Sequence, residues 1–287
     1  MNLYYVLLLA LAVVWNSSAA QPVKILFIGN SFTFGAGTEV KTYRPETVTD
    51  LNQKHIGGVP ALFKAFAVEA HLDYDVSLET AGGKGLDYHV KEKAAIIGKP
   101  WDVVCMHGYS TLDKEHPGDP ALLVSSAKEI AKLLHDRNPS VVLYLTATWA
   151  RADQVYPEKG AWHGKTVQTM TADVRKAYDQ AAAASPFFKG VIPVGEAWER
   201  AITKGLADPN PYDGIEPGKV DLWGKDHYHA SVYGYYLEAL TIFGVVTTQD
   251  PRSLGNQEHV AKDLGISPEQ AVALQQIAFE QIKENHH

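Results

Sequence analysis

Short apolar runs recur along the chain, and their length predicts the strands of a buried sheet. Four such runs are 23–29, 102–106, 141–146 and 190–194. Short stretches that are apolar without alternation are typical of strands covered on both faces. The segment 74–80 alternates instead, with Tyr74, Val76 and Leu78 on one side, which favours a strand nearer an edge of the sheet.

Segments with helical periodicity lie between these runs. Apolar residues recur every three or four positions in 62–70 and 123–134, and the stretch 166–184 is polar enough for a surface helix. Ser267, a proline after it and Gln270 predict a capped helix start near the end of the chain. Strands that alternate with helices indicate an α/β fold, in which helices cover both faces of a parallel sheet of about five strands.

The segment from Phe32 to Gly58 has no clear periodicity and is long for a connection within a compact domain. It is predicted either to be a functional loop over the edge of the sheet or to be merely mobile. No internal repeat divides the chain, so residues 21–287 are expected to form a single domain.

The first 20 residues have the pattern of a signal peptide. An apolar run from Leu3 to Trp15 is followed by small residues, including Ser18 and Ala20. The alternative is a retained membrane anchor, although the run is short for a membrane span. The sequence therefore predicts a secreted or periplasmic protein without stable membrane insertion.

The composition of the chain restricts the kinds of partner that the protein can bind. The chain is 46% hydrophobic and has a formal net charge of -7, so it can bury a large core but has no basic surface for nucleic acid. Cys105 is the only cysteine, which excludes an internal disulfide, and its apolar setting predicts a buried and unreactive thiol.

A candidate nucleophile follows the first predicted strand. Ser31 stands in Gly-Asn-Ser at a strand end, where parallel sheets bind ligands, although serine and asparagine are also ordinary turn residues. The G-x-S-x-G motif is absent. Asp226 and His229 can lie on one tight turn, so that the carboxylate orients the imidazole as a base. A helix is expected to start just after His229; the alternative for this pair is a solvated turn.

Together these signals match a family pattern. The segments IGNSFT, AGGKG and DHYH resemble the motifs of the SGNH hydrolases, also called GDSL esterases. The segments GGVPALFKAFA, PVGEAWERA and GYYLEALTIFG extend the resemblance over most of the chain after residue 20. The resemblance implies a flavodoxin-like three-layer α/β/α fold and ester hydrolysis, often of acetyl esters on carbohydrates, without metal or cofactor. By position it makes Ser31 the nucleophile, His229 the base and Asp226 its partner.

The donors for the oxyanion follow from the same resemblance, with one departure. The Ser31 N–H is the first donor and Gly83 the second, with Gly85 as the alternative glycine. The family usually places an asparagine after the third of these strands, where this chain has Ser110. His107 aligns with the glutamine of some carbohydrate-acetylesterase branches. His107 and Ser110 are therefore candidate donors, and a buried structural histidine is the alternative for His107.

Other candidates concern substrate and metal. Trp149 and Arg151 follow the fourth strand and could stack on a sugar or hold a carboxylate, unless Trp149 simply packs in a surface loop. His227 beside Asp226 and His229 does not make a metal site, because adjacent side chains do not converge readily on one ion. Trp162, His163 and His89 receive no role and are expected in surface or loop positions.

The sequence thus predicts a serine esterase that removes acetyl groups from a carbohydrate. Its partner is an acylated small molecule or glycan. Three alternatives use the same fold: a carbohydrate-binding protein without turnover, an acyltransferase, and a lysophospholipase or lipase.

Overall fold

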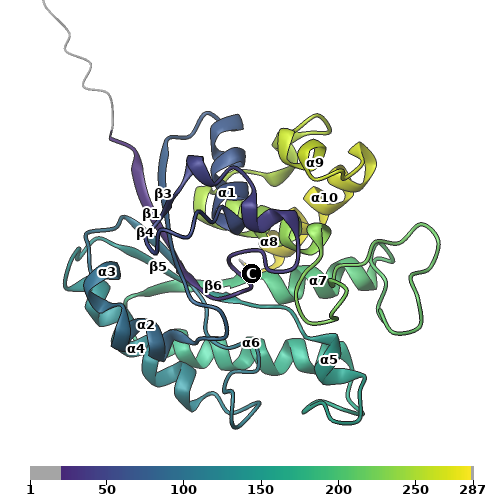
Figure 1. Cartoon of the computed structure of the whole chain (residues 1–287), viewed down its shortest axis with the longest axis horizontal. Coiled ribbons are helices and arrows are strands. Elements are labelled where there is room, and N and C mark those ends of the chain that lie inside the picture. The colour runs from purple at the N-terminus through teal and green to yellow at the C-terminus, as the bar shows by residue number, and fades with distance from the viewer. Residues whose placement is uncertain (1–20, 286–287) are drawn as a thin grey trace, which may run out of the picture.

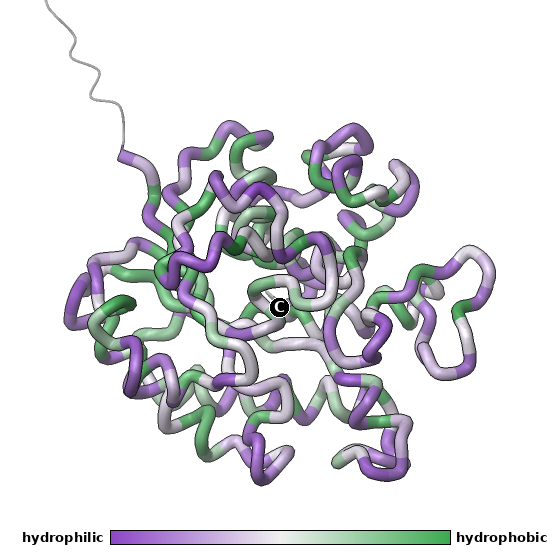
Figure 2. Tube along the Cα trace, viewed as in Figure 1, coloured by the Kyte–Doolittle hydropathy of each residue, from purple (hydrophilic) through white to green (hydrophobic). Residues whose placement is uncertain are grey.

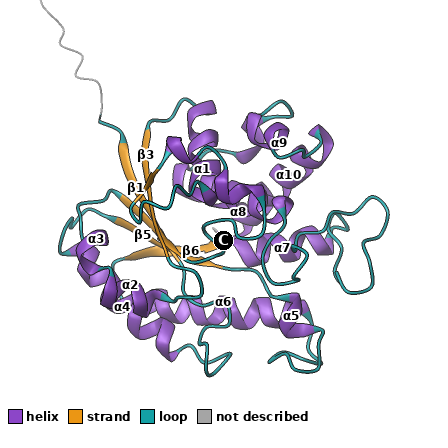
Figure 3. Cartoon of the chain, in the orientation of Figure 1, coloured by secondary structure: helices purple, strands orange, loops and turns teal. Residues whose placement is uncertain are grey.

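The protein is described here by a computed structural model of residues 21–285, which builds an α/β fold around one parallel sheet (Figures 1 and 3). The six strands run in the order β2-β3-β1-β4-β5-β6. Their bounds are Val23–Gly29 for β1, Thr49–Asp50 for β2, Tyr74–Thr80 for β3, Val103–Met106 for β4, Val142–Ala147 for β5 and Phe188–Pro193 for β6. The predicted signal peptide and the terminal His286 and His287 lie outside these described residues.

The sheet has one strand more than the sequence indicates. The additional strand β2 lies in the segment Phe32–Gly58 and pairs with β3 through Thr49 and Ser77. The same segment contains two 3-10 helices, η1 (Glu39–Thr42) and η2 (Pro45–Thr47). Two residues of strand carry too little periodicity to be recognised in a sequence, and only their pairing with β3 defines them.

Helices cover both faces of the sheet, as predicted (Figure 1). One layer contains α1 (Gly58–Glu69), α7 (Val194–Thr203), α8 (Val232–Thr247), α9 (His259–Asp263) and α10 (Pro268–Asn285), with η3 (Pro251–Leu254). The other contains α2 (Leu86–Glu92), α3 (Ala94–Ile97), α4 (Ala121–His135), α5 (Ala152–Val155) and α6 (Val167–Ala183). The three-layer α/β/α architecture is therefore confirmed.

The predicted helix starts are capped by side chains. Ser267 accepts the N–H of Gln270 at 3.3 Å, and the Gln270 side chain accepts the N–H of Ser267 at 3.0 Å, so two otherwise unpaired backbone donors are satisfied. Ser231 accepts the N–H of Gly234 in the same way and starts α8. A capped start immediately after His229 fixes the direction in which the preceding turn leaves the helix.

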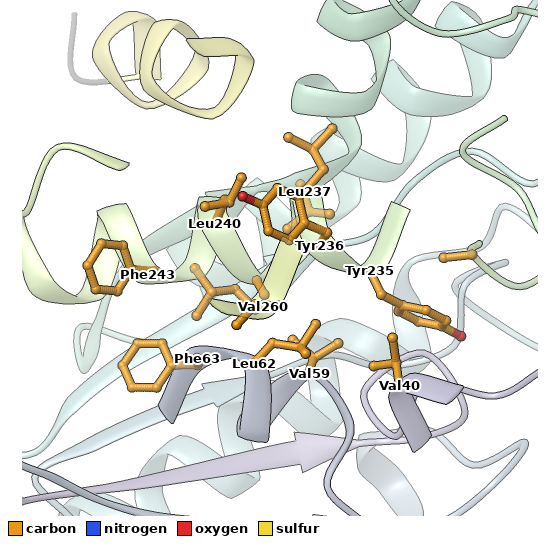
Figure 4. Packing of buried hydrophobic residues seen from close by; sticks show 14 of the residues in the cluster. Val40, Val59, Leu62, Phe63, Tyr235, Tyr236, Leu237, Leu240, Phe243 and Val260 are labelled. Carbon is orange, nitrogen blue, oxygen red and sulfur yellow. The ribbon is translucent and has the colours of Figure 1, made fainter. Parts of the chain in front are cut away.

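Two apolar cores hold the layers together. Figure 4 shows α1 and α8 packed through rings and branched chains such as Phe63 and Phe243, which meet edge to face. Each fully buried side chain of this size contributes about 1.5–3 kcal/mol. The second core lies under α4 and α6. Apolar residues accordingly follow the central strands in Figure 2, while polar residues lie on the outer loops and helix faces.

The topology places the candidate residues at the carboxyl ends of the strands. Strand β1 lies between β3 and β4, so the chain first winds to one side of β1 and then to the other. Loops that leave the carboxyl ends of these strands therefore diverge around the end of β1 and leave a crevice there.

No helix within residues 21–285 is both long enough and apolar enough to cross a membrane.

Candidate active site

The turn after β1 fixes the backbone of Ser31 and leaves its hydroxyl free. The Ser31 carbonyl accepts the N–H of Ala36 at 3.0 Å and the hydroxyl of Tyr235 on α8 at 3.4 Å. Within residues 21–285 the Ser31 hydroxyl and backbone N–H form no hydrogen bond. The residue is 7% exposed. A serine held in this way keeps both its hydroxyl oxygen and one backbone donor available to a ligand.

Asn30 connects this turn to the two neighbouring loops. Its side-chain amide donates to the carbonyl of Lys84, after β3, at 3.0 Å and to that of Gly108, after β4, at 3.1 Å. Its side-chain oxygen accepts the N–H of Phe32 at 3.1 Å. One buried side chain thus brings three separate loops to the same place, and the sequence indicated only a turn residue there.

His107 lies beneath the turn, where both of its ring nitrogens have partners. Nε2 lies 2.6 Å from the Thr33 hydroxyl, and Nδ1 lies 3.1 Å from the Gly108 carbonyl. A side chain at Gly29 would collide with Thr33 and His107, so glycine is required for this close approach. His107 is 3% exposed. Because both of its ring nitrogens already have partners, His107 is a buried residue that supports the turn and is not a free donor for an oxyanion.

Burial lowers the pKa of His107 from its ordinary 6.5 to about 4, against a smaller opposite effect of its hydrogen bond to Gly108. As the pH falls, His107 binds a proton near pH 6.5 in the unfolded chain but only near pH 4 in the folded protein. Stability is therefore expected to fall by about 3 kcal/mol as the pH drops through this window.

The variant His107→Gln removes this titration. Denaturant unfolding at pH 7 and pH 4.5 should show the wild type losing about 2 kcal/mol more than the variant. Equal losses in both proteins would contradict a neutral, buried His107.

Asp226 and His229 form an ordered pair on the turn before α8. His229 Nδ1 lies 2.7 Å from Asp226 Oδ2, while Asp226 Oδ1 accepts the N–H groups of Tyr228 and His229 at 3.1 and 2.9 Å. Burial alone would raise the pKa of Asp226, but these hydrogen bonds lower it below its ordinary value. The ionised carboxylate fixes the imidazole with Nδ1 as donor. His229 Nε2 is then an acceptor, and it is buried without a partner among the described residues.

An aromatic stack joins this pair to the turn of Ser31. The Phe32 ring lies flat on the Trp149 ring, with ring centroids 4.1 Å apart. The rings of Phe32 and His229 meet edge to face, with centroids 5.7 Å apart. Trp149 stacks in turn on Trp198 at 4.6 Å. The indole N–H of Trp149 donates to the carbonyl of Tyr228 at 3.3 Å. The stack brings His229 beside the residue that follows Ser31, although no hydrogen bond between Ser31 and His229 occurs in the described chain.

Two expectations about exposed residues are wrong. Trp149 is 0% exposed, because Phe32 and Trp198 cover its two faces, so it cannot stack on a sugar, one of its two expected roles, and is a packed residue instead. His89 is fully buried on α2, where it bonds Glu79, and so lies in neither a surface nor a loop position. Trp162 lies in a turn, as expected, although its side chain is buried and its N–H donates to Asp173. Aromatic and histidine side chains in these segments face inward because the layers around them are closed. His163, by contrast, is exposed, and Cys105 is buried as predicted, with a raised thiol pKa.

Arg151 lies at the site but its charge is already balanced. It forms a bidentate pair with Asp153, at 2.9 and 2.6 Å, and donates to the Ser110 hydroxyl at 3.3 Å. Its guanidinium also covers the ring of Tyr228 at 3.6 Å. Ser110 keeps its own proton available as a donor. The arginine therefore connects the loop after β4 to the turn of His229 and is not free to bind a carboxylate.

Gly83 occupies the loop that Asn30 holds through Lys84. Its φ of +65° favours glycine, and a Cβ there would meet no atom within 4 Å, so this backbone faces open space. Its N–H has no acceptor among residues 21–285. The N–H groups of Ser31 and Gly83 are therefore both available to a ligand.

A cavity of about 480 Å³ borders the Asp226–His229 turn. Its other wall is the segment 36–38, which follows the turn of Ser31. This volume suits a small ligand or part of a larger one. Within residues 21–285, no three histidine, cysteine or acidic side chains come together as metal ligands.

Sequence reasoning missed the supporting residues Asn30, Thr33, Tyr228 and Tyr235. Only Asn30 had a visible signal, because it adjoins Ser31. The partners of all four come from segments distant in the chain, which no local pattern reports.

The fold is shared with solved structures of SGNH and GDSL-like proteins. A DUF4886 family protein from Bacteroides uniformis superimposes with a TM-score of 0.63 at 19% identity, over 93% of this chain and 97% of its own. A protein assigned as an SGNH hydrolase from Slackia heliotrinireducens gives 0.51 at 20% identity, over 79% and 100%. A protein assigned as a GDSL-like lipase from Parabacteroides merdae gives 0.54 at 16% identity, over 79% and 96%. No protein-family profile and no curated protein matches the chain.

Proposed function

We propose that this protein is a serine ester hydrolase of the SGNH type that removes acetyl groups from a carbohydrate outside the cytoplasm. The observation that carries the proposal is the Asp226–His229 pair, in which Nε2 is free and the imidazole ring lies against Phe32, the residue after Ser31. A carboxylate, an imidazole and a serine hydroxyl in this relation are the components of a nucleophilic triad.

In the proposed reaction, Ser31 Oγ attacks the acetyl carbonyl carbon while His229 Nε2 takes the hydroxyl proton. The oxyanion is stabilised by the N–H groups of Ser31 and Gly83, with the Ser110 hydroxyl as a third donor. His229 returns the proton to the sugar oxygen as the acyl bond breaks. Water then attacks the acetyl-enzyme by the same route and releases acetate.

Two features favour a short acyl group on a polar carrier. The cavity at His229 has a volume of about 480 Å³, and three charged residues, Asp221, Lys225 and Asp226, are among those that line it. A long fatty chain would need a longer apolar groove to remove it from water.

Labelling with a fluorophosphonate followed by mass mapping tests the proposal. We expect one adduct, on Ser31. Acetate release from acetylated glycans, and faster cleavage of 4-nitrophenyl acetate than of a long-chain ester, then test the substrate class. An adduct on another residue, or a preference for the long chain, would contradict the corresponding part of the proposal.

The second candidate is a carbohydrate-binding protein without turnover. It is favoured by the absence of the usual asparagine donor at Ser110 and by the engagement of both His107 nitrogens. Loss of one oxyanion donor typically costs about 10²–10³ in rate. Folded protein that binds glycan but takes no fluorophosphonate would support this candidate.

Trp149→Phe is expected to lower activity only because it changes the position of His229. The change removes the N–H that holds the Tyr228 carbonyl and shortens the stack beside His229, and small misplacements of a base can cost up to about 10² in rate. We expect kcat for 4-nitrophenyl acetate to fall about tenfold or more.

The matched control is Trp101→Phe. Trp101 is also buried, and its N–H donates to the Ile97 carbonyl at 2.7 Å, but it lies in the other core. Both variants should lose similar stability, roughly 1–3 kcal/mol for the unpaired carbonyl, while only Trp149→Phe should lose kcat. Equal kcat in the two variants would exclude the positioning role.

A further inference from the structure

The loop between α7 and α8 carries two exposed apolar side chains. Tyr212 retains 45% exposure and Ile215 retains 39%. Among the residues described, the other large apolar side chains with comparable exposure are Val68 on α1 and Val272 on α10, which stand singly. Isolated exposed apolar residues are ordinary, whereas Tyr212 and Ile215 lie only three positions apart on one loop. Figure 1 shows this loop extending beyond α7.

The loop is anchored at its base. Ala207 and Val220 form a β-bridge, and the buried carboxylate of Asp208 accepts the N–H groups of Asn210 and Glu216 at 3.0 and 2.9 Å. A loop fixed in this way loses little conformational entropy when a ligand binds.

Tyr212 reaches the turn that carries His229. Its ring centroid lies 4.2 Å from that of His227 and 5.8 Å from that of Tyr156. Burial, with the nearby carboxylates of Asp153 and Asp226, raises the pKa of the Tyr212 phenol. Tyr212 thus packs against His227, the residue next to the Asp226 that bonds His229 at 2.7 Å.

We propose that Tyr212 is the stacking residue of a subsite for an uncharged sugar ring next to the esterified position. The inference rests on the proposed function. A tyrosine offers an apolar ring face and a hydroxyl, which match the C–H face and hydroxyl edge of a pyranose. The exposed carboxylate of the adjacent Asp213 can accept hydrogen bonds from sugar hydroxyls.

The charges around Tyr212 select against acidic sugars. The segments 151–153, 208–220 and 225–226 together contain five carboxylates and three cationic side chains. Two of these cations are already paired, Arg151 with Asp153 at 2.6 Å and Lys219 with Glu216 at 2.7 Å. A uronate would therefore meet an excess of negative charge, whereas a neutral glycan would not.

The test measures binding and turnover separately. Calorimetry on the Ser31→Ala protein gives the Kd for acetylated xylo-oligosaccharide with and without the additional change Tyr212→Ala, and we expect Kd to rise about fivefold to tenfold on loss of the ring. Tyr212→Phe keeps the ring and should retain most of the affinity. Val272→Ala, at an equally exposed position on α10, is the matched control and should not change Kd.

In the enzyme with Ser31 intact, Tyr212→Ala should lower the ratio of kcat/KM for the acetylated oligosaccharide to that for 4-nitrophenyl acetate about tenfold. Oligogalacturonate should bind more weakly than the neutral oligosaccharide, with a gap that narrows in about 0.5 M salt. An unchanged Kd in Tyr212→Ala, or tighter binding of oligogalacturonate, overturns the subsite. Binding lost in Tyr212→Ala while the wild type cleaves no ester supports the subsite and refutes the esterase.

Discussion

Ser31→Ala is expected to reduce ester cleavage to near background, a loss of about 10⁴-fold or more in kcat, because it removes the proposed nucleophile of the acyl-enzyme. The change removes one oxygen atom and leaves the backbone bonds of this turn to Ala36 and Tyr235 in place. The folded structure should therefore survive, and fluorophosphonate labelling should disappear together with activity. Both are measured on the same preparation, with acetate release as a second assay.

Ser126→Ala is the control for this experiment. Ser126 is a buried serine on α4 whose hydroxyl bonds the Leu122 carbonyl, remote from the turn of Ser31. It should keep both activity and labelling. Retained turnover in Ser31→Ala would instead assign the nucleophile to another residue or to a water molecule.

The second large effect is expected at the Asp226–His229 pair. His229→Ala removes the base and should bring kcat close to that of Ser31→Ala. Asp226→Asn should retain roughly ten to a hundred times more activity, because the carboxylate orients and stabilises the imidazole but does not itself carry the proton. The hydrogen bonds that lower the pKa of Asp226 keep it ionised at neutral pH, so its loss is a loss of orientation and charge together.

Initial rates of 4-nitrophenyl acetate cleavage by Ser31→Ala, His229→Ala and Asp226→Asn test this order of activities. His163→Ala, a change at an exposed histidine outside this turn, is the control and should match the wild type. Full activity in His229→Ala would refute the assignment of the base. Activity in Asp226→Asn below that in His229→Ala would mean that the carboxylate acts on the substrate directly.

Local patterns predicted the elements that build the site. The apolar run 23–29 and the caps at Ser231 and Ser267 are visible in sequence because burial and helix starts each impose their own periodicity and residue type. The Asp226–His229 contact is also local, since three positions fit one turn. The two-residue strand β2 is the opposite case, because only its partner β3 makes it a strand.

The positions of Trp149 and His107 could not be predicted from their neighbours in the chain. Both follow strands, where either an exposed rim or a buried layer is possible. The choice depends on what packs against them: Phe32 and Trp198 enclose Trp149, and Thr33 takes the ring nitrogen of His107. These partners are separated from them by dozens of residues, so only the folded chain defines the environment.

The sequence by itself determined the parallel three-layer fold, the helix that begins after His229 and the chemical types of the candidate site, since each depends on periodicity, capping or short spacing. The tertiary structure alone decided how the turn of Ser31 is held. Asn30 joins it to the loops after β3 and β4, and Trp149 joins it to the turn of His229. These contacts are long-range hydrogen bonds and ring stacking, whose partners meet only when the layers close around the sheet.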